Sequence, residues 1–173
     1  MHAAGLQADL GLGRLEWIDP EYTRGESLRT AVSGLGRVDV VWVAGGNTYN
    51  LAHHVHASGG GEIIKDLLAD GTVFVGASAG SILAGRTVQT VFWKNWDDQT
   101  CEGTVNVDWK DAHVSRGLDV AGGISIFPHA NGPYGGADWQ NEQAQRHGHN
   151  DHTVVRLADG QGVVVEDGTY RLV

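Results

Sequence analysis

The first half of the chain alternates between short apolar runs and longer segments whose apolar residues recur every three or four positions. Such runs are typical of strands buried in a parallel sheet, and such segments are typical of helices packed on it. Alternating strands and helices predict an α/β fold with a mostly parallel sheet flanked by helices. We expect strands at Arg14–Ile18, Val38–Val43 and Val73–Gly76, and helices at Glu21–Leu35, Tyr49–Ala57, Glu62–Ala69 and Ser81–Ala84.

The pattern changes after Gly85. Thr87–Trp93 and Ile124–Phe127 have the composition of strands, and a long polar stretch separates them. Near the C-terminus, Asp159-Gly160 and Asp167-Gly168 separate short apolar runs, which predicts antiparallel hairpin strands. These runs are Val154–Leu157, Gly162–Glu166 and Tyr170–Val173. The glycines are spread between the apolar runs rather than gathered in a linker, so residues 1–173 are expected to form a single domain.

Composition and charge narrow the function classes. The chain has 173 residues, of which 12 are basic and 21 acidic, giving a formal charge of −9. We therefore expect no nucleic-acid partner, because such proteins present a basic face. One cysteine, Cys101, leaves no intramolecular disulfide and no cysteine-rich zinc site. No apolar run reaches the roughly 18–20 residues of a membrane span, and the first residues do not resemble a signal peptide. The expectation is a soluble, cytoplasmic protein without a membrane partner.

Gly76-Ala77-Ser78-Ala79-Gly80 fits the pattern G-x-S-x-G and lies where a predicted strand meets a predicted helix. A turn of this kind raises the serine hydroxyl above the sheet and points the Ala79 amide at a substrate carbonyl. A second oxyanion donor usually comes from a loop after a neighbouring strand, and Gly45-Gly46-Asn47 follows Val38–Val43. Glycine there lets the backbone approach a substrate closely. The alternatives are a tight turn with a capping serine and a phosphate-binding turn.

A serine nucleophile needs a base, and the base needs an orienting acid. His129 is the strongest candidate base among the nine histidines, because it follows the apolar strand Ile124–Phe127. Asp98 and Asp97 are the candidate acids, since both lie between Ser78 and His129 beside tryptophans that would partly desolvate them. Asp98 is slightly favoured for its reach, Glu142 is the next candidate, and ordinary solvated loop aspartates are the alternative.

Three stretches together resemble peptidase family S51, the group of peptidase E and cyanophycinase. They are Val43-Ala44-Gly45-Gly46-Asn47-Thr48, Val75-Gly76-Ala77-Ser78-Ala79-Gly80-Ser81 and Phe127-Pro128-His129, in the family's order. The resemblance implies a fold similar to class I glutamine amidotransferases, with serine in place of the cysteine nucleophile. It also implies Ser78 as nucleophile, His129 as base, and the Gly46 and Ala79 amides as the oxyanion hole.

The sequence departs from this family at two places. Family members normally begin with a further strand and a glycine-containing loop, and Met1-His2-Ala3-Ala4-Gly5 starts after them. A missing central strand would expose neighbouring edges. A shortened form or a partner subunit, such as a second copy in a homo-oligomer, would account for this. The segment Phe92–Asp98 is also longer than its counterpart in peptidase E, so the identity of the acid stays open.

The resemblance implies a serine peptidase that hydrolyses short peptides, including dipeptides with N-terminal Asp, and that requires no metal or cofactor. Gly45, Asn47 and Arg86 are candidate substrate-binding residues, and Arg86, Lys94 or Arg146 would pair with an aspartyl side chain. One alternative is a noncatalytic, ligand-binding relative. Another is a metal-dependent protein using His147, His149 and His152, although histidines in a polar stretch are usually solvated.

Overall fold

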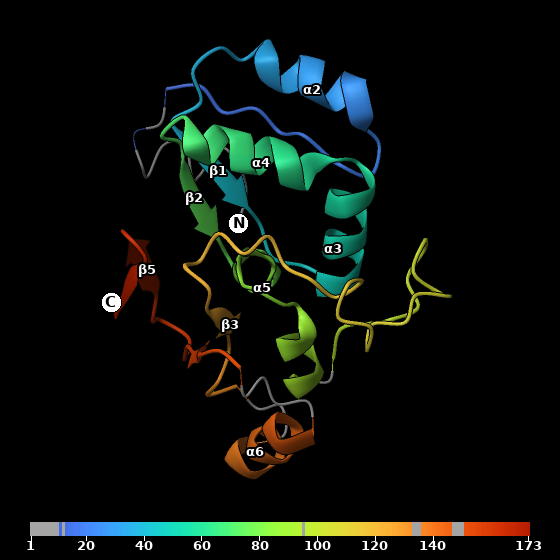
Figure 1. Cartoon of the computed structure of the whole chain (residues 1–173), viewed down its shortest axis with the longest axis vertical. Helices are drawn as coiled ribbons and strands as arrows, with labels where there is room; N and C mark the ends of the chain where they lie inside the picture. The colour runs from blue at the N-terminus through green and yellow to red at the C-terminus, as the bar shows by residue number, and fades with distance from the viewer. Residues whose placement is uncertain (1–10, 12, 95, 133–135, 147–150) are drawn as a thin grey trace.

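The computed structural model describes residue 11 and residues 13–94, 96–132, 136–146 and 151–173. These residues form an α/β fold in which helices surround short strands, and two of the three strand pairs are parallel. In Figure 1, α2 and α4 lie together at one end, α5 is central and α6 lies at the opposite end. The elements are α2 (Gly25–Ser33), β1 (Val40–Val43), α3 (Thr48–Ala57), α4 (Gly60–Ala69), β2 (Val73–Gly76), α5 (Ala79–Ala84), the 3-10 helix η1 (Gln89–Trp93), β3 (Ser125–Phe127), α6 (Gly136–Arg146), β4 (Val154–Arg156), β5 (Val163–Glu166) and β6 (Thr169–Leu172).

Strands β1 and β2 form a parallel pair, in register from Val40 opposite Val73 to Val43 opposite Gly76. Both strands are apolar, although Val40, Trp42 and Val73 are among the exposed large hydrophobic residues. The crossover between them is made by α3 and α4. Because the strands are parallel, both carboxyl ends lie at the same edge, and the loops after Val43 and Gly76 meet there.

Strands β3 and β4 form a second parallel pair, from Ser125 opposite Val154 to Phe127 opposite Arg156. Helix α5 contacts β2, α3 and β3, and it lies between the two pairs in Figure 1. The pairing continues past the strands, because Leu157 N–H donates to Phe127 O and Ala130 N–H donates to Leu157 O, both at 2.9 Å. The segments that follow β3 and β4 are therefore fixed side by side.

The core consists of two clusters that meet at α5. The larger packs α3 and α5 against β1 and the segment after η1, and it includes Val43, Tyr49, Ile82, Leu83 and Trp109. The smaller packs the end of α5 against β3 and β4 through Ala84, Ile126 and Val155. All six residues of α5 are buried, so the helix that follows Ser78 is held on every side.

Two predicted strands are absent from the described structure. Arg14–Ile18 belongs to no strand, because no described backbone pairs with it. Thr87–Trp93 is mainly the 3-10 helix η1. Thr87 Oγ1 accepts a hydrogen bond from Gln89 N–H at 3.1 Å, a local bond that turns the chain away from the extended conformation.

The C-terminal region is partly as predicted. Strands β5 and β6 form the expected antiparallel hairpin, with Asp167 (φ 48°) and Gly168 (φ 72°) at its turn. This pair of positive φ angles is typical of a tight two-residue hairpin turn. Val154–Leu157 was predicted as a third hairpin strand, which is wrong because β4 pairs in parallel with β3 instead. The polar helix α6 was not predicted. None of the helices formed by the described residues has the length and apolarity that crossing a membrane requires.

Candidate active site

Ser78 occupies the sharp turn between β2 and α5, with φ 52° and ψ −109°. This conformation is costly for a residue with a side chain, by roughly 1–3 kcal/mol, and is usually found at functional sites. Glycine is needed on both sides. A Cβ on Gly76 would lie 2.6 Å from Gly80 O, and one on Gly80 would lie 2.1 Å from Val43 O. The G-x-S-x-G pattern is thus explained by close packing of β2, α5 and β1.

His129 lies directly against this serine. Its Nε2 is 3.0 Å from Ser78 Oγ, and its own φ of 60° is again unusual for a non-glycine residue. The residue follows β3 and Pro128. The pairing of β3 with β4 and the contact of β3 with α5 together hold the ring at the serine.

Asp159 completes the arrangement from the segment after β4. Its Oδ1 is 2.5 Å from His129 Nδ1. The Asp159 backbone is fixed in turn, because its N–H donates to Asn131 Oδ1 at 2.7 Å. The serine, histidine and aspartate are connected in the order of a catalytic triad. The triad is open to solvent on one side, since the side chains of His129 and Asp159 are 33% and 63% exposed.

The structure corrects the prediction that Asp97 or Asp98 orients His129. The Asp97 carboxylate, only 2% exposed, accepts hydrogen bonds from Thr48 N–H at 2.8 Å and from Lys94 Nζ at 3.1 Å. The Asp98 carboxylate accepts from the backbone N–H and the hydroxyl of Thr100, which lower its pKa.

The next candidate acid, Glu142, is engaged elsewhere, because it pairs with Arg146 on α6. Asp159 was missed because Asp159-Gly160 resembles a simple hairpin turn. The available signal was that Asp159, like His129, shortly follows an apolar run. Recognising that these two runs are parallel neighbours would have brought the two residues together.

The loop Gly45-Gly46-Asn47 lies where the sequence predicts the second oxyanion donor. A Cβ on Gly45 would be 3.1 Å from Ser78 Cβ and 3.6 Å from Ser78 Oγ. Gly46 has φ 149°, a conformation that favours glycine. Asn47 caps α3 by accepting from Tyr49 N–H and Asn50 N–H, and its Nδ2 donates to Asp98 O. The loop is therefore held against the serine and at the start of α3.

A buried ion pair reinforces the same loop. Lys94 Nζ contacts both Asp97 and, at 3.3 Å, Thr48 Oγ1, which is the first residue of α3. The lysine side chain is fully buried, and burial lowers its pKa while Asp97 opposes that effect. Lys94 Nζ also lies 4.8 Å from the centre of the Trp96 ring, which in turn is 5.8 Å from the His129 ring. This pair therefore connects the loop beside Ser78 with the surroundings of His129.

Arg86 does not reach this site, contrary to the prediction that it binds substrate. Its N–H donates to Ile124 O, which precedes β3, and its guanidinium pairs with Asp151 at 3.1 Å. His129 follows the other end of β3. Ser78 precedes α5 and Arg86 follows it, so the two residues lie at opposite ends of this helix.

The histidine-rich segment is only partly described. His147 and His149 lie outside the described residues, while His152 contacts Ser125 Oγ and Asp151 at 2.8 Å. Within the described ranges, no three His, Cys, Asp or Glu side chains gather in a group suited to a metal ion.

Comparisons with known proteins bear on the family and the fold of this chain. The model of peptidase family S51 matches residues 21–173. A structure determined at 1.5 Å, of a candidate peptidase E protein from Listeria monocytogenes EGD-e, is similar with a TM-score of 0.73 and 19% identity. The match covers 98% of this chain and 75% of that chain. No protein with a curated description matches. At this identity the structural likeness concerns the fold alone.

Proposed function

This chain belongs to peptidase family S51, and we propose that it is a serine-type peptidase that cleaves short peptides through an acyl-enzyme. The observation that carries the proposal is the continuous contact from Ser78 Oγ to His129 Nε2 and from His129 Nδ1 to Asp159 Oδ1. The strained turn at Ser78, between Gly76 and Gly80, does not itself require a histidine and an aspartate beside the serine hydroxyl. The arrangement instead matches what nucleophilic attack by a hydroxyl requires.

Each member of the triad has a defined task in the proposed reaction. His129 Nε2 accepts the proton of the Ser78 hydroxyl as Oγ attacks the scissile carbonyl carbon. The resulting imidazolium then gives that proton to the leaving amine, and the peptide C–N bond breaks. In the second half, water gives a proton to His129 Nε2 and attacks the acyl carbon. The bond between that carbon and Ser78 Oγ then breaks, and His129 returns the proton to Oγ as the acid product leaves. Asp159 holds His129 Nδ1–H and stabilises the positive ring.

The oxyanion formed in both halves needs two preorganised N–H donors. We assign them to Gly46, in the loop packed against Ser78, and to Ala79, directly after it. The described amides that follow are occupied by turn carbonyls: Gly80 N–H donates to Ala77 O, and Ser81 N–H donates to Ser78 O. Ala79 is not among these donors. Removing one oxyanion donor in a serine protease costs roughly 10²- to 10³-fold in kcat.

The proposal is for short peptides in general rather than for N-terminal Asp in particular. A strong aspartyl preference needs a basic group available beside the serine. The three candidates are already engaged: Arg86 with Asp151, Lys94 with Asp97, and Arg146 with Glu142. We therefore expect kcat/KM for Asp-Leu, Asn-Leu and Ala-Leu to agree within about tenfold, which is 1.4 kcal/mol.

The test is hydrolysis of a dipeptide panel by the wild-type chain and by Ser78→Ala. Loss of the nucleophile should reduce kcat by about 10⁶-fold with the thermal transition unchanged. Near-normal turnover in folded Ser78→Ala protein would refute the peptidase proposal. Binding of the dipeptides without turnover by either protein would favour the noncatalytic alternative. A value for Asp-Leu that is 100-fold above the others would refute only the broad specificity.

A further inference from the structure

Lys94 and Asp97 form an ion pair that is almost completely withdrawn from solvent. The Lys94 side chain is 0% exposed and the Asp97 side chain is 2% exposed. Lys94 Nζ lies 3.2 Å and 3.1 Å from the two carboxylate oxygens. Taking two charges out of water is costly, and apolar residues of similar size often stabilise a fold equally well. Stability alone is therefore a weak explanation for this pair, and its contacts indicate a second role.

The first set of contacts leads to the loop that carries the assigned oxyanion donor. Asp97 Oδ2 accepts from Thr48 N–H at 2.8 Å, and Lys94 Nζ donates to Thr48 Oγ1 at 3.3 Å. Thr48 is fully buried and follows Gly46 by two residues. Because the ion pair holds both the amide and the hydroxyl of Thr48, it limits how far the chain after Gly46 can move.

The same loop is held at two further points. Asn47 Nδ2 donates to Asp98 O at 2.8 Å. On the other side, Gly45 packs so closely on Ser78 that an added Cβ would lie 3.1 Å from Ser78 Cβ. Gly46 has φ 149° and lies between these held residues. With no side chain of its own to fix it, the Gly46 amide takes its direction from the residues on either side.

A second set of contacts leads from Lys94 to the proposed base. Lys94 Nζ lies 4.8 Å from the centre of the Trp96 ring, which is within the range of a cation–π interaction. The centre of the Trp96 ring lies in turn 5.8 Å from that of the His129 ring, at an angle of 56°. A shift of this ammonium group would therefore alter the packing of Trp96 against His129.

We propose that Lys94 and Asp97 are positioning residues, which orient the Gly46 amide and the His129 ring without contacting the substrate. This inference rests on the proposed function, because it assigns an effect on the same reaction. A misplacement of about 1 Å can lower a rate roughly 10²-fold, and loss of one oxyanion donor costs roughly 10²- to 10³-fold in kcat. Loss of the pair should therefore lower kcat at least tenfold in folded protein and leave KM nearly unchanged.

The test compares Lys94→Met with Lys94→Met/Asp97→Asn, measuring urea denaturation and the hydrolysis of Ala-Leu. The single variant leaves a buried carboxylate without its cation, whereas the double variant contains neither charge. The urea midpoint should fall in the single variant and recover in part in the double variant. In both, kcat should stay at least tenfold below wild type, because both lack the ammonium group that contacts Thr48 and Trp96. A purely structural role does not produce recovery of stability without recovery of kcat.

A milder variant keeps the test decisive if the charge variants do not fold. Thr48→Val preserves the shape of the side chain and leaves the Asp97 bond to the Thr48 amide in place. It removes only the hydroxyl that accepts from Lys94 Nζ. We expect kcat for Ala-Leu to fall at least threefold and KM to stay within threefold of wild type. An unchanged kcat in folded Thr48→Val would count against the proposal.

A transition-state analogue distinguishes a displaced oxyanion site from general damage. The probe is 1-aminoethylboronic acid, the boronic acid analogue of alanine. Its boron accepts the Ser78 Oγ lone pair as His129 takes the hydroxyl proton, and the tetrahedral adduct places an oxygen at the oxyanion position. The inhibition constant should rise at least tenfold in Lys94→Met/Asp97→Asn, while KM for Ala-Leu stays within threefold of wild type.

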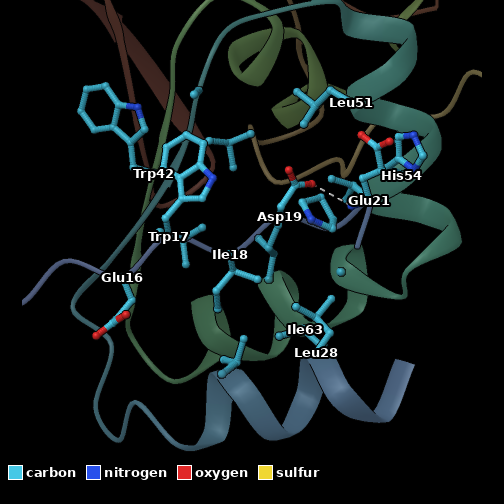
Figure 2. A pocket seen from close by; sticks show the side chains of 18 of the residues that line it. Glu16, Trp17, Ile18, Asp19, Glu21, Leu28, Trp42, Leu51, His54 and Ile63 are labelled. Atoms are coloured by element: carbon cyan, nitrogen blue, oxygen red, sulfur yellow. Dashed lines mark hydrogen bonds between the residues drawn. The ribbon is translucent and has the colours of Figure 1, made fainter. Parts of the chain in front are cut away.

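Leu28→Ala is the matched control for lost stability. Leu28 is 4% exposed and belongs to α2, which contacts α4. Figure 2 shows it beside Ile63 of α4, and both residues line the same cavity. The space left by the missing side chain should lower the urea midpoint by an amount similar to Lys94→Met. The kcat of the folded fraction and the inhibition constant of the boronic acid should stay within twofold of wild type.

Three outcomes would overturn the positioning role. One is a kcat that recovers in the double variant together with the urea midpoint. Another is an equal loss of kcat in Leu28→Ala at the same urea midpoint, and the third is a rise of KM with kcat unchanged. If the wild-type chain hydrolyses no dipeptide, the proposed function fails and this inference fails with it. Normal hydrolysis by the wild-type chain together with any of the three outcomes refutes the positioning role alone.

Discussion

Replacement of Asp159 by Asn tests whether the exposed aspartate acts as the third member of the triad. The substitution keeps the shape of the side chain and removes the charge that faces His129 Nδ1 at 2.5 Å. It leaves Ser78, the amides of Gly46 and Ala79, and the bond from Asp159 N–H to Asn131 unaltered. The effect on kcat therefore reports the stabilisation of the positively charged ring in the transition state.

The magnitude follows from the exposure of the pair. Two unit charges about 4 Å apart attract by roughly 1 kcal/mol in water and roughly 4 kcal/mol at an effective dielectric constant of 20. With Asp159 63% exposed and His129 33% exposed, the interaction lies between these limits. At 1.36 kcal/mol per decade, kcat/KM should fall between about fivefold and 10³-fold. This is less than the roughly 10⁴-fold loss found when a buried triad aspartate is replaced.

The assay is steady-state hydrolysis of Ala-Leu, with Asp98→Asn as the matched control. Asp98 undergoes the same chemical change, but its carboxylate is bound to Thr100 rather than to His129, so its kcat/KM should stay within twofold of wild type. The reasoning is refuted if Asp159→Asn keeps more than half of the wild-type activity. It is equally refuted if Asp98→Asn loses as much as Asp159→Asn.

Three further predictions concern stability and are measured by urea denaturation. Lys94→Met should lower the free energy of unfolding by about 3–5 kcal/mol, because it leaves Asp97 buried without its cation. The double variant Lys94→Met/Asp97→Asn should recover part of that loss. Equal stability of the single and the double variant would contradict this explanation. Gly80→Ala should destabilise the fold by more than about 1 kcal/mol because its Cβ meets Val43 O, whereas Gly13→Ala, at a glycine with open space around it, should have little effect. Burial is the main cause that lowers the pKa of His56 in the fold. As pH falls below about 6.5, the unfolded chain therefore binds more protons than the folded chain, so acid should lower the free energy of unfolding. His56→Gln should make the free energy of unfolding less dependent on pH.

The sequence predicted most of the elements around Ser78 because their signals are local. The apolar run of β2 was predicted with its observed bounds. The glycines of the G-x-S-x-G pattern, Gly76 and Gly80, are where a Cβ would clash with neighbouring backbone. Likewise, Pro128 and the apolar strand before it were enough to single out His129. Its contact with Ser78 at 3.0 Å agrees with that choice.

The carboxylate that contacts His129 could not be found in the same way, because its position depends on pairing between segments distant in sequence. Asp159 meets His129 only because β4 joins β3 in parallel, and a short apolar run carries no information on which strand it pairs with. The prediction of Asp97 failed for a related reason. Its position between Ser78 and His129, beside tryptophans, suggested a catalytic carboxylate. In the structure this carboxylate instead accepts hydrogen bonds from Lys94 Nζ and from Thr48 N–H at the start of α3.

The most direct test of the proposed nucleophile is covalent labelling with a fluorophosphonate, followed by intact-mass and peptide mass spectrometry. The account predicts one adduct per wild-type chain, located on Ser78, and none on Ser78→Ala. His129→Ala should be labelled far more slowly, because no base then removes the hydroxyl proton. Absence of an adduct on folded wild-type protein, or an adduct that persists in Ser78→Ala, would contradict the assignment of Ser78 as the nucleophile.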